Sequence, residues 1–503
     1  MNIMMLLEMA SSGFGDRVAI GTGDDALTYQ ELFDKAGQAA TRFATADIAH
    51  VGLIDVSSPT LPVVLFGAGW AGLPFVPINY RLDAETLTTL AARVAPARAV
   101  CHPDFVDLVS SVDGISTEDR GAFLRGLDGL KPHHEAWGMD GEDIAVLLFT
   151  SGTTGDPKAA VLRHKHLVSY ILGSVEFMGA GEDEAILVSV PPYHVAGLAS
   201  LLSSVFAGRR IVQLPQFDAD EWIDLAIAER VTNAMVVPTM LSRIVDRLDE
   251  RHLTIPSLRA MSYGGGKMPL PIIERALELL PGTNFVNAYG LTETSSTLSL
   301  LGPDDHREAL ASDDPDVRAR LASVGRPLPS VEISIRDENG APVPAGTPGE
   351  VWVRGEQVSG EYVGKGSRVD AEGWFPTNDG GHLDDAGYLF VSGRIDDVII
   401  RGGENISPGE IEDVIISHPA VMDAAAIGVA DQQWGEVIAV VAVPDHGASV
   451  EPDELIELVR SQLRGSKVPE HVVFRSELPY NETGKLLRRV LRDELAHLGD
   501  GSI

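Results

Sequence analysis

Residues 150–158 read Thr-Ser-Gly-Thr-Thr-Gly-Asp-Pro-Lys and follow a charge-free apolar run, residues 144–149. After them, residues 164–178 carry apolar side chains at helical spacing, so we expect the order strand, loop, helix. The two glycines let the backbone approach a ligand closely, and the N–H groups and four hydroxyls can donate hydrogen bonds. Lys158 adds a positive charge. This composition favours a polyphosphate ligand.

The spacing of this loop is not that of the P-loop. Only two residues separate Gly155 from Lys158, and neither Ser nor Thr follows the lysine. A Ser/Thr/Gly-rich surface turn is therefore the alternative interpretation of the loop when it is considered alone.

The composition is that of an acidic globular protein. Among 503 residues, 73 Asp and Glu stand against 39 Lys and Arg, which gives a formal net charge of −34. This charge repels nucleic acid and anionic membranes, so we expect no nucleic-acid partner and expect anionic ligands to be held by locally placed cations. Cys101 is the only cysteine, which excludes an intrachain disulfide and a multi-cysteine metal site.

The apolar stretches do not indicate export or membrane insertion. No basic region precedes the apolar N-terminus, which Glu8 interrupts, so a secretory signal is not expected. Residues 61–80 and 186–208 approach membrane length, but both contain prolines that fit buried helix–turn–strand segments better than a spanning helix. We expect a cytoplasmic protein without membrane insertion.

Hydrophobic patterning predicts an α/β protein. Short strand patterns alternate with helical patterns, which implies mainly parallel sheets covered by helices; the strand candidates are 18–20, 51–54, 75–78, 211–214, 234–237 and 285–287. Residues 301–321, rich in Asp, Arg and Ala, are expected to form a solvated excursion. From residue 324, alternation with period two predicts a smaller antiparallel β unit.

A compact α+β segment is predicted from about Asp396. We therefore predict a large N-terminal domain, residues 1–395, made of two βα lobes plus a β subdomain. A small mobile C-terminal domain, residues 396–503, follows.

Five ordered stretches agree with a known family. They are 150–158, 287–294, 377–379, 393–396 and 481–485. Together with residues 27–32, 74–82, 349–350 and 402–406, they resemble the acyl-adenylate-forming superfamily of AMP-dependent synthetases and ligases. This superfamily includes acyl-CoA synthetases, peptide-synthetase adenylation domains and firefly-type luciferases. The resemblance extends from about residue 15 to residue 492.

The resemblance implies an ATP-dependent carboxylic acid ligase that uses Mg²⁺. Its first step joins a carboxylate to the α-phosphate of ATP and releases pyrophosphate, and its second passes the acyl group to a thiol, most simply that of CoA. Two anions must meet in the first step, which calls for cations and fixed donors.

The resemblance also assigns roles to individual residues. Thr292 would bind the α-phosphate and Glu293 the Mg²⁺, and Lys485 would bridge the carboxylate and the α-phosphate from the small domain. Tyr289 would stack on adenine, Asp379 would accept from the ribose hydroxyls with Arg394 assisting, and Asp396 would be the hinge. The remaining nucleotide-binding residues implied are Thr150, Ser151, Gly152, Thr153, Thr154, Lys158, Gly264, Gly265, Asn287 and Gly290.

Each assignment has a plainer alternative. Glu293 could complement a helix dipole, and Asp379 could cap a turn. Arg394 could form a surface ion pair, and Lys485 could be solvated. The ordered combination favours the functional interpretation, although a non-catalytic nucleotide-binding module remains an alternative from a different class.

The acid pocket is expected to be apolar and lined by small residues. Its expected lining is His194, Val236, Thr239, Gly264, Gly265 and Gly266, with His194 also a candidate catalytic group. Val195 follows His194, at a position where peptide-synthetase domains usually carry an aspartate that pairs with the α-amino group of the substrate. Because a buried ammonium without a counter-charge is costly, we expect a medium-sized, cyclic or aromatic acid rather than an α-amino acid.

Several positions depart from the family pattern. Asn378 replaces a glycine before Asp379, and asparagine tolerates the left-handed backbone that a glycine would adopt. Lys267 stands where proline is frequent, so it could neutralise an acidic substrate or lie at the surface. No aromatic precedes Lys467, which leaves open whether the acceptor is CoA or, as in an amide ligase, an amine. The protein is expected to be a monomer or a homodimer.

Overall fold

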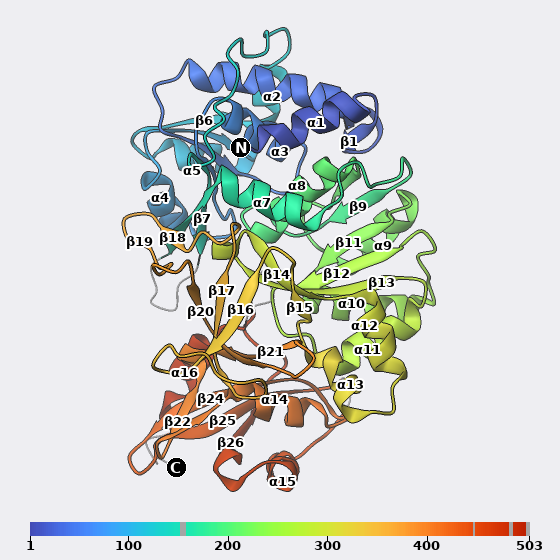
Figure 1. Cartoon of the computed structure of the whole chain (residues 1–503), viewed down its shortest axis with the longest axis vertical. Coiled ribbons are helices and arrows are strands. Elements are labelled where there is room, and N and C mark those ends of the chain that lie inside the picture. The colour runs from blue at the N-terminus through green and yellow to red at the C-terminus, as the bar shows by residue number, and fades with distance from the viewer. Residues whose placement is uncertain (151–156, 446–447, 482–485, 499–503) are drawn as a thin grey trace.

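The computed structural model describes residues 1–150, 157–445, 448–481 and 486–498, and the element counts below refer to this part of the chain. Ser151, Gly152, Thr153, Thr154 and Lys485, for which roles are predicted above, lie outside the described residues. Figure 1 shows an elongated molecule in which the N-terminal elements lie at one end and the C-terminal elements at the other.

The first large sheet has eight strands. Their order is β19 (Gly366–Ser367), β18 (Glu361–Tyr362), β8 (Lys158–Arg163), β7 (Ile144–Thr150), β4 (Phe75–Pro77), β3 (His50–Ile54), β5 (Ala97–Cys101) and β6 (Ile115–Asp119). From β7 to β6 the neighbouring strands are parallel, whereas β8, β18 and β19 join antiparallel at one edge.

The second large sheet has nine strands. Their order is β15 (Arg326–Pro327), β14 (Ser296–Leu301), β13 (Asn284–Leu291), β12 (Ala260–Gly264), β11 (Asn233–Val236), β9 (Ala185–Val188), β10 (Arg210–Gln213), β1 (Val18–Ile20) and β2 (Leu27–Thr28). The six strands from β13 to β1 are parallel.

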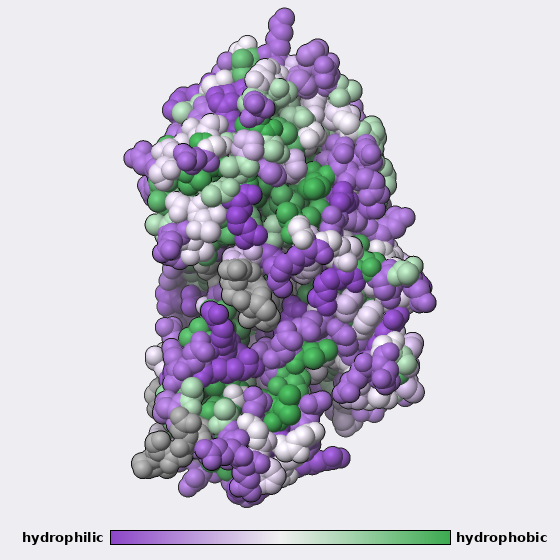
Figure 2. All heavy atoms as spheres, turned by 90° about the vertical axis from the view of Figure 1, so that its left-hand side faces the viewer, coloured by the Kyte–Doolittle hydropathy of each residue, from purple (hydrophilic) through white to green (hydrophobic). Residues whose placement is uncertain are grey.

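The largest core lies between the two sheets. It contains residues of both sheets and of six helices, α1 (Met4–Phe14), α2 (Tyr29–Ala44), α3 (Thr60–Trp70), α6 (Arg120–Arg125), α7 (His164–Ser174) and α8 (Val195–Ala207). Every residue of α3 is buried, so its uniformly apolar sequence belongs to the core and not to a membrane. No helix in the described part of the chain is long and apolar enough to cross a bilayer, and Figure 2 shows hydrophilic residues over much of one face with separate hydrophobic patches.

The outer faces of the sheets carry the other N-terminal helices. Residues of α4 (Ala84–Ala92) and α5 (Pro103–Ser110) pack on the first sheet, and residues of α9 (Ala219–Ala228), α10 (Pro238–Arg251) and α11 (Leu270–Leu279) pack on the second. A short helix, α6 (Arg120–Arg125), follows β6, and its Phe123 belongs to the largest core. Helices therefore cover both faces of each sheet, as βα alternation requires.

The remaining strands form two smaller sheets. An antiparallel sheet contains β16 (Glu332–Arg336), β17 (Gly349–Arg354), β20 (Phe375–Leu383) and β21 (Leu389–Arg394). The C-terminal sheet contains β23 (Glu404–Ile406), β22 (Ile399–Arg401), β25 (Gly435–Pro444), β24 (Val421–Asp431) and β26 (His471–Phe474). Two separate cores cover its faces, one with α14 (Pro408–Ile416) and α15 (Pro452–Gln462), the other with α16 (Arg488–Leu495).

This arrangement confirms the predicted class, α/β with a large N-terminal domain and a small α+β C-terminal domain. Two local predictions are wrong. The predicted order strand, loop, helix omits a strand: residues 158–163 form β8, which pairs antiparallel with β7, and the predicted helix begins after it at His164 as α7. Ala159–Leu162 are buried, and β18 pairs with the other side of β8. The order is therefore strand, loop, strand, helix.

Residues 301–321 are not a solvated excursion. They form α12 (Pro303–Ala311) and α13 (Pro315–Ala319), and His306, Ala309 and Leu321 are buried. The buried Tyr263 hydroxyl lies 2.9 Å from His306 Nε2, and His306 Nδ1 lies 2.7 Å from the Gly302 carbonyl oxygen. These contacts tie the segment to the end of β12, a link that residue composition does not reveal.

Candidate active site

The predicted pocket residues follow the carboxyl ends of neighbouring parallel strands. Val236 ends β11 and pairs with Tyr263 of β12, Gly264 pairs with Ala288 of β13, and His194 follows β9. Ligands of open α/β sheets bind at this edge, because the loops that leave the carboxyl ends converge there. Val236 and Gly264 are buried, Thr239 is half-buried, and Gly265 and Gly266 are exposed at the rim.

Gly264 permits a close approach between β12 and β13. A Cβ atom at this position would lie 2.2 Å from the carbonyl oxygen of Ala288. Any side chain would therefore push the two strands apart where the pocket and the nucleotide signature meet.

The loop 151–157 is closed at its base by strand pairing. Thr150 of β7 pairs with Lys158 of β8, and the Thr150 hydroxyl donates to the Lys158 carbonyl oxygen at 3.3 Å. Arg93 donates to the Pro157 carbonyl oxygen at 2.7 Å. The structure thus places the two described ends of the predicted phosphate loop, Thr150 and Lys158, side by side.

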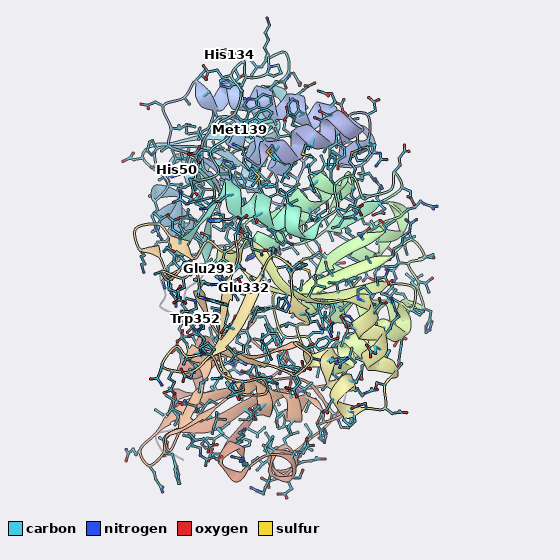
Figure 3. The ribbon with its side chains drawn as sticks, viewed as in Figure 1. His50, His134, Met139, Glu293, Glu332 and Trp352 are labelled. Atoms are coloured by element: carbon cyan, nitrogen blue, oxygen red, sulfur yellow. The ribbon has the colours of Figure 1, made fainter. Side chains whose placement is uncertain are left out.

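The chain reverses sharply after β13 and presents two predicted residues there. Thr292 and Glu293 form a 3₁₀ turn, η2 (Thr292–Thr294), and Ser295 and Ser296 have positive φ values of 58° and 109°. A Cβ atom at Gly290 would lie 1.7 Å from the Ser296 carbonyl oxygen, so only glycine allows this reversal. Figure 3 shows Glu293 in the middle of the molecule's length.

Tyr289 and Arg394, which come from two other motifs, both contact Asp379. Its carboxylate accepts from the Tyr289 hydroxyl at 2.6 Å and pairs with Arg394 Nε at 3.1 Å. The side chain of Asp379 is only 8% exposed, so its charge depends on these partners. Burial and the Asp379 charge raise the pKa of Tyr289 well above its usual value, and the tyrosine stays protonated. Burial acts to lower the pKa of Arg394, but the combined attraction of Asp379 and the neighbouring Tyr289, Glu293 and Asp397 raises it overall.

Backbone geometry supports this cluster. Asn378 has a positive φ of 63°, as its replacement of glycine predicted. Arg394 also donates to the Thr377 carbonyl oxygen at 2.9 Å. A carboxylate oxygen can accept more than one hydrogen bond, which is compatible with the ribose contact predicted for Asp379.

Glu293 has a partner that sequence reasoning missed. The hydroxyl of Tyr362, from β18, donates a short hydrogen bond to Glu293 Oε1. The backbone N–H groups of Ser359 and Gly360 donate to the Glu293 carbonyl oxygen at 2.8 and 3.2 Å. The two side chains are 69 positions apart, so no local pattern signals the contact.

The residues present fit Mg²⁺, which proteins bind through one or two carboxylates while substrate phosphates and water complete the shell. In the described part of the chain, no group of three or more His, Cys, Asp or Glu residues could hold a metal alone. Glu293 is half-buried, and among the described residues no hydrogen bond to its Oε2 is present. A half-buried carboxylate with one oxygen left open by the described residues suits a metal that arrives with a nucleotide.

His194 is an uncharged imidazole with an unsatisfied nitrogen. Burial, with a smaller contribution from Arg81, lowers its pKa to about 3. Its Nε2 is inaccessible to solvent and has no hydrogen-bond partner among the described residues. The centroid of the His194 ring lies 4.6 Å from the centroid of the Tyr193 ring. A buried polar atom without a partner costs free energy, so this nitrogen suits a polar group of a ligand.

Asn287 lies in β13, before Tyr289. Its buried side-chain amide donates to the Ser323 carbonyl oxygen at 3.0 Å. Its role in nucleotide binding stays a prediction.

Contacts across the domain boundary surround the predicted hinge. Asp396 accepts from the Asn378 side-chain amide at 2.8 Å and lies in the 3₁₀ turn η4 (Ile395–Asp397). Lys267 pairs with Asp413 of α14 at 2.6 Å and lies 3.4 Å from the Gly409 carbonyl oxygen. The side chain of Lys267 thus reaches the C-terminal domain.

Comparison with known families gives two matches. The chain matches the family described as AMP-binding enzyme over residues 7–363, and that described as AMP-binding enzyme C-terminal domain over residues 410–485. A 2-succinylbenzoate–CoA ligase of Bacillus cereus is 33% identical over 492 residues, covering 95% of each chain. A feruloyl-CoA synthase of an Amycolatopsis species is 32% identical over 487 residues, covering 94% of this chain and 95% of that protein.

Solved structures agree along the whole chain. ATP-bound MatB from Rhodopseudomonas palustris superposes with a TM-score of 0.88 at 28% identity, covering 99% of this chain and 100% of that one. The apo form of MatB, with the same identity and coverage, superposes with a TM-score of 0.78. The o-succinylbenzoate–CoA synthetase MenE of Bacillus subtilis, in complex with ATP and magnesium ion, gives 0.82 at 28% identity, covering 97% of this chain and 99% of that one.

Proposed function

The chain belongs to the AMP-binding enzyme family, as the resemblance predicted, and we propose that it activates a medium-sized, cyclic or aromatic carboxylic acid with ATP and transfers the acyl group to CoA. The single observation that carries the proposal is the junction of Tyr289, Asp379 and Arg394 beside Glu293, because four residues from three separate motifs form one polar site. The 2-succinylbenzoate and feruloyl relatives both act on ring-bearing acids, which supports the proposed substrate class.

Each protein group has a task in the first half-reaction. Asp379 accepts from the ribose hydroxyls, Tyr289 stacks on adenine, and Arg394 holds Asp379 in place. Glu293 holds Mg²⁺, which neutralises phosphate charge when it is bound with the nucleotide. Lys158 and the hydroxyls of the loop bind the β- and γ-phosphates.

The acid lies against the ends of β9, β11 and β12. Because the His194 imidazole is neutral, it adds no charge to the pocket and can donate one hydrogen bond to the substrate carboxylate in the tautomer protonated at Nε2. The carboxylate then attacks the α-phosphate, to which Thr292 donates, and pyrophosphate leaves. The charge of Lys485 brings the two anions together.

We further propose that the C-terminal domain, residues 396–503, rotates about Asp396 between the half-reactions. The higher TM-score against ATP-bound than against apo MatB supports reading the observed arrangement as the adenylating one. After rotation the thiol of CoA attacks the acyl carbonyl and AMP leaves. We place this reaction in the cytoplasm, and we infer a monomer or homodimer.

A panel of acids tests the proposal. Pyrophosphate release is measured with ATP, Mg²⁺ and aromatic, cyclic, linear or dicarboxylic acids, and products with CoA are identified by mass. We expect release with ring-bearing acids and thioester formation with CoA. Replacement of CoA by amines tests the alternative: ready amide formation without any thioester would make the protein an amide ligase. No acid-dependent release would favour a nucleotide-binding module.

A further inference from the structure

Tyr362 links two parts of the nucleotide site. Its hydroxyl donates to Glu293 Oε1, while its backbone belongs to β18, which pairs with β8 at Tyr362 and Ala160. Strand β8 begins at Lys158, the last residue of the phosphate loop. One residue therefore contacts both the candidate metal ligand and the strand that ends the loop.

Strand β18 is held firmly on β8. Arg163 makes two hydrogen bonds to Glu361, at 3.0 and 2.8 Å, and the Val363 N–H group donates to the Ala159 carbonyl oxygen at 3.0 Å. Bidentate arginine–carboxylate pairs fix geometry as well as charge. The backbone of Tyr362 is thus fixed on β8, the strand that begins at Lys158.

The hydrogen bond restricts the carboxylate of Glu293. A glutamate side chain rotates freely in solution, and ordering it costs conformational entropy. Tyr362 takes one oxygen, Oε1, and among the described residues no hydrogen bond occupies Oε2. The remaining oxygen is thereby directed by a contact between two protein side chains.

We propose that Tyr362 is a positioning residue for adenylation, which orients the carboxylate of Glu293 for Mg²⁺ and ties it to β8. This inference rests on the proposed function, because it takes Glu293 as the metal ligand. In this proposal Tyr362 acts through Glu293 and not by its own contact with substrate or metal.

The test compares Tyr362→Phe with Tyr388→Phe. Tyr388 also donates its hydroxyl to a carboxylate, Asp305 at 2.6 Å, but that carboxylate lies in α12 and has no proposed metal role. The first readout is acid-dependent pyrophosphate release at limiting and saturating Mg²⁺. The second is the rise in melting temperature caused by ATP, measured with Mg²⁺ and with EDTA, which does not depend on turnover.

We expect Tyr362→Phe to lower kcat/KM for ATP by about tenfold at limiting Mg²⁺ and by less at saturating Mg²⁺. The Mg²⁺-dependent part of the ATP-induced melting shift should shrink as well. Tyr388→Phe should leave both readouts unchanged. In a double-mutant cycle, Tyr362→Phe should cause no further loss in the Glu293→Gln background, because the two residues act as one unit.

Three outcomes would overturn the proposal. They are a wild-type Mg²⁺-dependent melting shift in Tyr362→Phe, losses that multiply in the double variant, and a greater fall in unliganded melting temperature than Tyr388→Phe causes. The last would show a structural role. If Glu293→Gln is impaired while Tyr362→Phe is normal, only this inference fails. If the wild-type protein releases no pyrophosphate and Glu293→Gln changes nothing, the proposed function fails.

Discussion

Removal of the charge of Lys267 should slow adenylation while sparing acyl transfer. Lys267 lies at the rim of the pocket, but its ammonium pairs with Asp413 on α14 of the C-terminal domain. The pair spans the two domains, so it stabilises only those arrangements in which α14 faces the pocket rim. If the observed arrangement is the adenylating one, Lys267→Ala shifts the protein away from it.

The size of the effect of Lys267→Ala follows from the solvent exposure of the Lys267–Asp413 ion pair. The atoms are 2.6 Å apart, but the two side chains are 45% and 60% exposed, so water screens the attraction. Exposed pairs contribute about 0.2–1 kcal/mol, which changes an equilibrium between two arrangements by roughly 1.4- to fivefold. We expect adenylation to slow within that range at low ionic strength, and the difference from wild type to fade in high salt.

The chain offers a matched control. Lys165 pairs with Glu142 at the same distance of 2.6 Å, with side chains 42% and 62% exposed, but both residues belong to the N-terminal domain. Lys165→Ala therefore removes an equivalent ion pair without touching the domain boundary. Pyrophosphate release reports the first half-reaction, and consumption of a chemically made acyl-adenylate with CoA reports the second.

The expected result is a specific slowing of pyrophosphate release in Lys267→Ala, with Lys165→Ala like the wild type. Equal slowing of both half-reactions by Lys267→Ala would mean that the pair does not distinguish the two arrangements. Equal behaviour of the two variants would show that the cross-domain position of Lys267 has no energetic consequence.

Two further predictions concern the division of labour and the pH dependence of stability. Lys485→Ala should cripple pyrophosphate release but not consumption of a preformed acyl-adenylate, whereas Asp396→Pro, which restricts φ at the hinge, should do the opposite; equal damage to both steps by Lys485→Ala would contradict the proposed alternation. Burial lowers the pKa values of His164 and His166 to about 4, so at pH 5 each is protonated in the unfolded chain but not in the folded protein. Each should therefore cost about 2 kcal/mol of stability between pH 7 and pH 5. The melting temperature should fall less between pH 7 and pH 5 in His166→Gln than in the wild type. Replacement of the exposed His134 should leave the wild-type fall unchanged.

The sequence alone determined the family and most of the fold. The ordered stretches from residue 150 to residue 485 predicted an AMP-forming acid–thiol ligase, and the family matches and acyl-CoA ligase relatives confirm that class. Local patterns were sufficient for most strands because buried parallel strands are short apolar runs bounded by turns. They missed the strand at residues 158–163, where a buried run after the loop pairs back on β7 before the predicted helix begins at His164.

Only the tertiary structure decided how side chains far apart in sequence meet. Tyr289 and Asp379 are 90 positions apart, and Glu293 and Tyr362 are 69 apart, yet each pair shares a hydrogen bond. The role of Lys267 was open between an acidic substrate and the surface, and the structure places it at the surface, with its charge against Asp413 of the other domain. Residue type and local spacing indicate which chemistry a side chain can perform, but its partner depends on strand order and domain placement, which are properties of the whole fold.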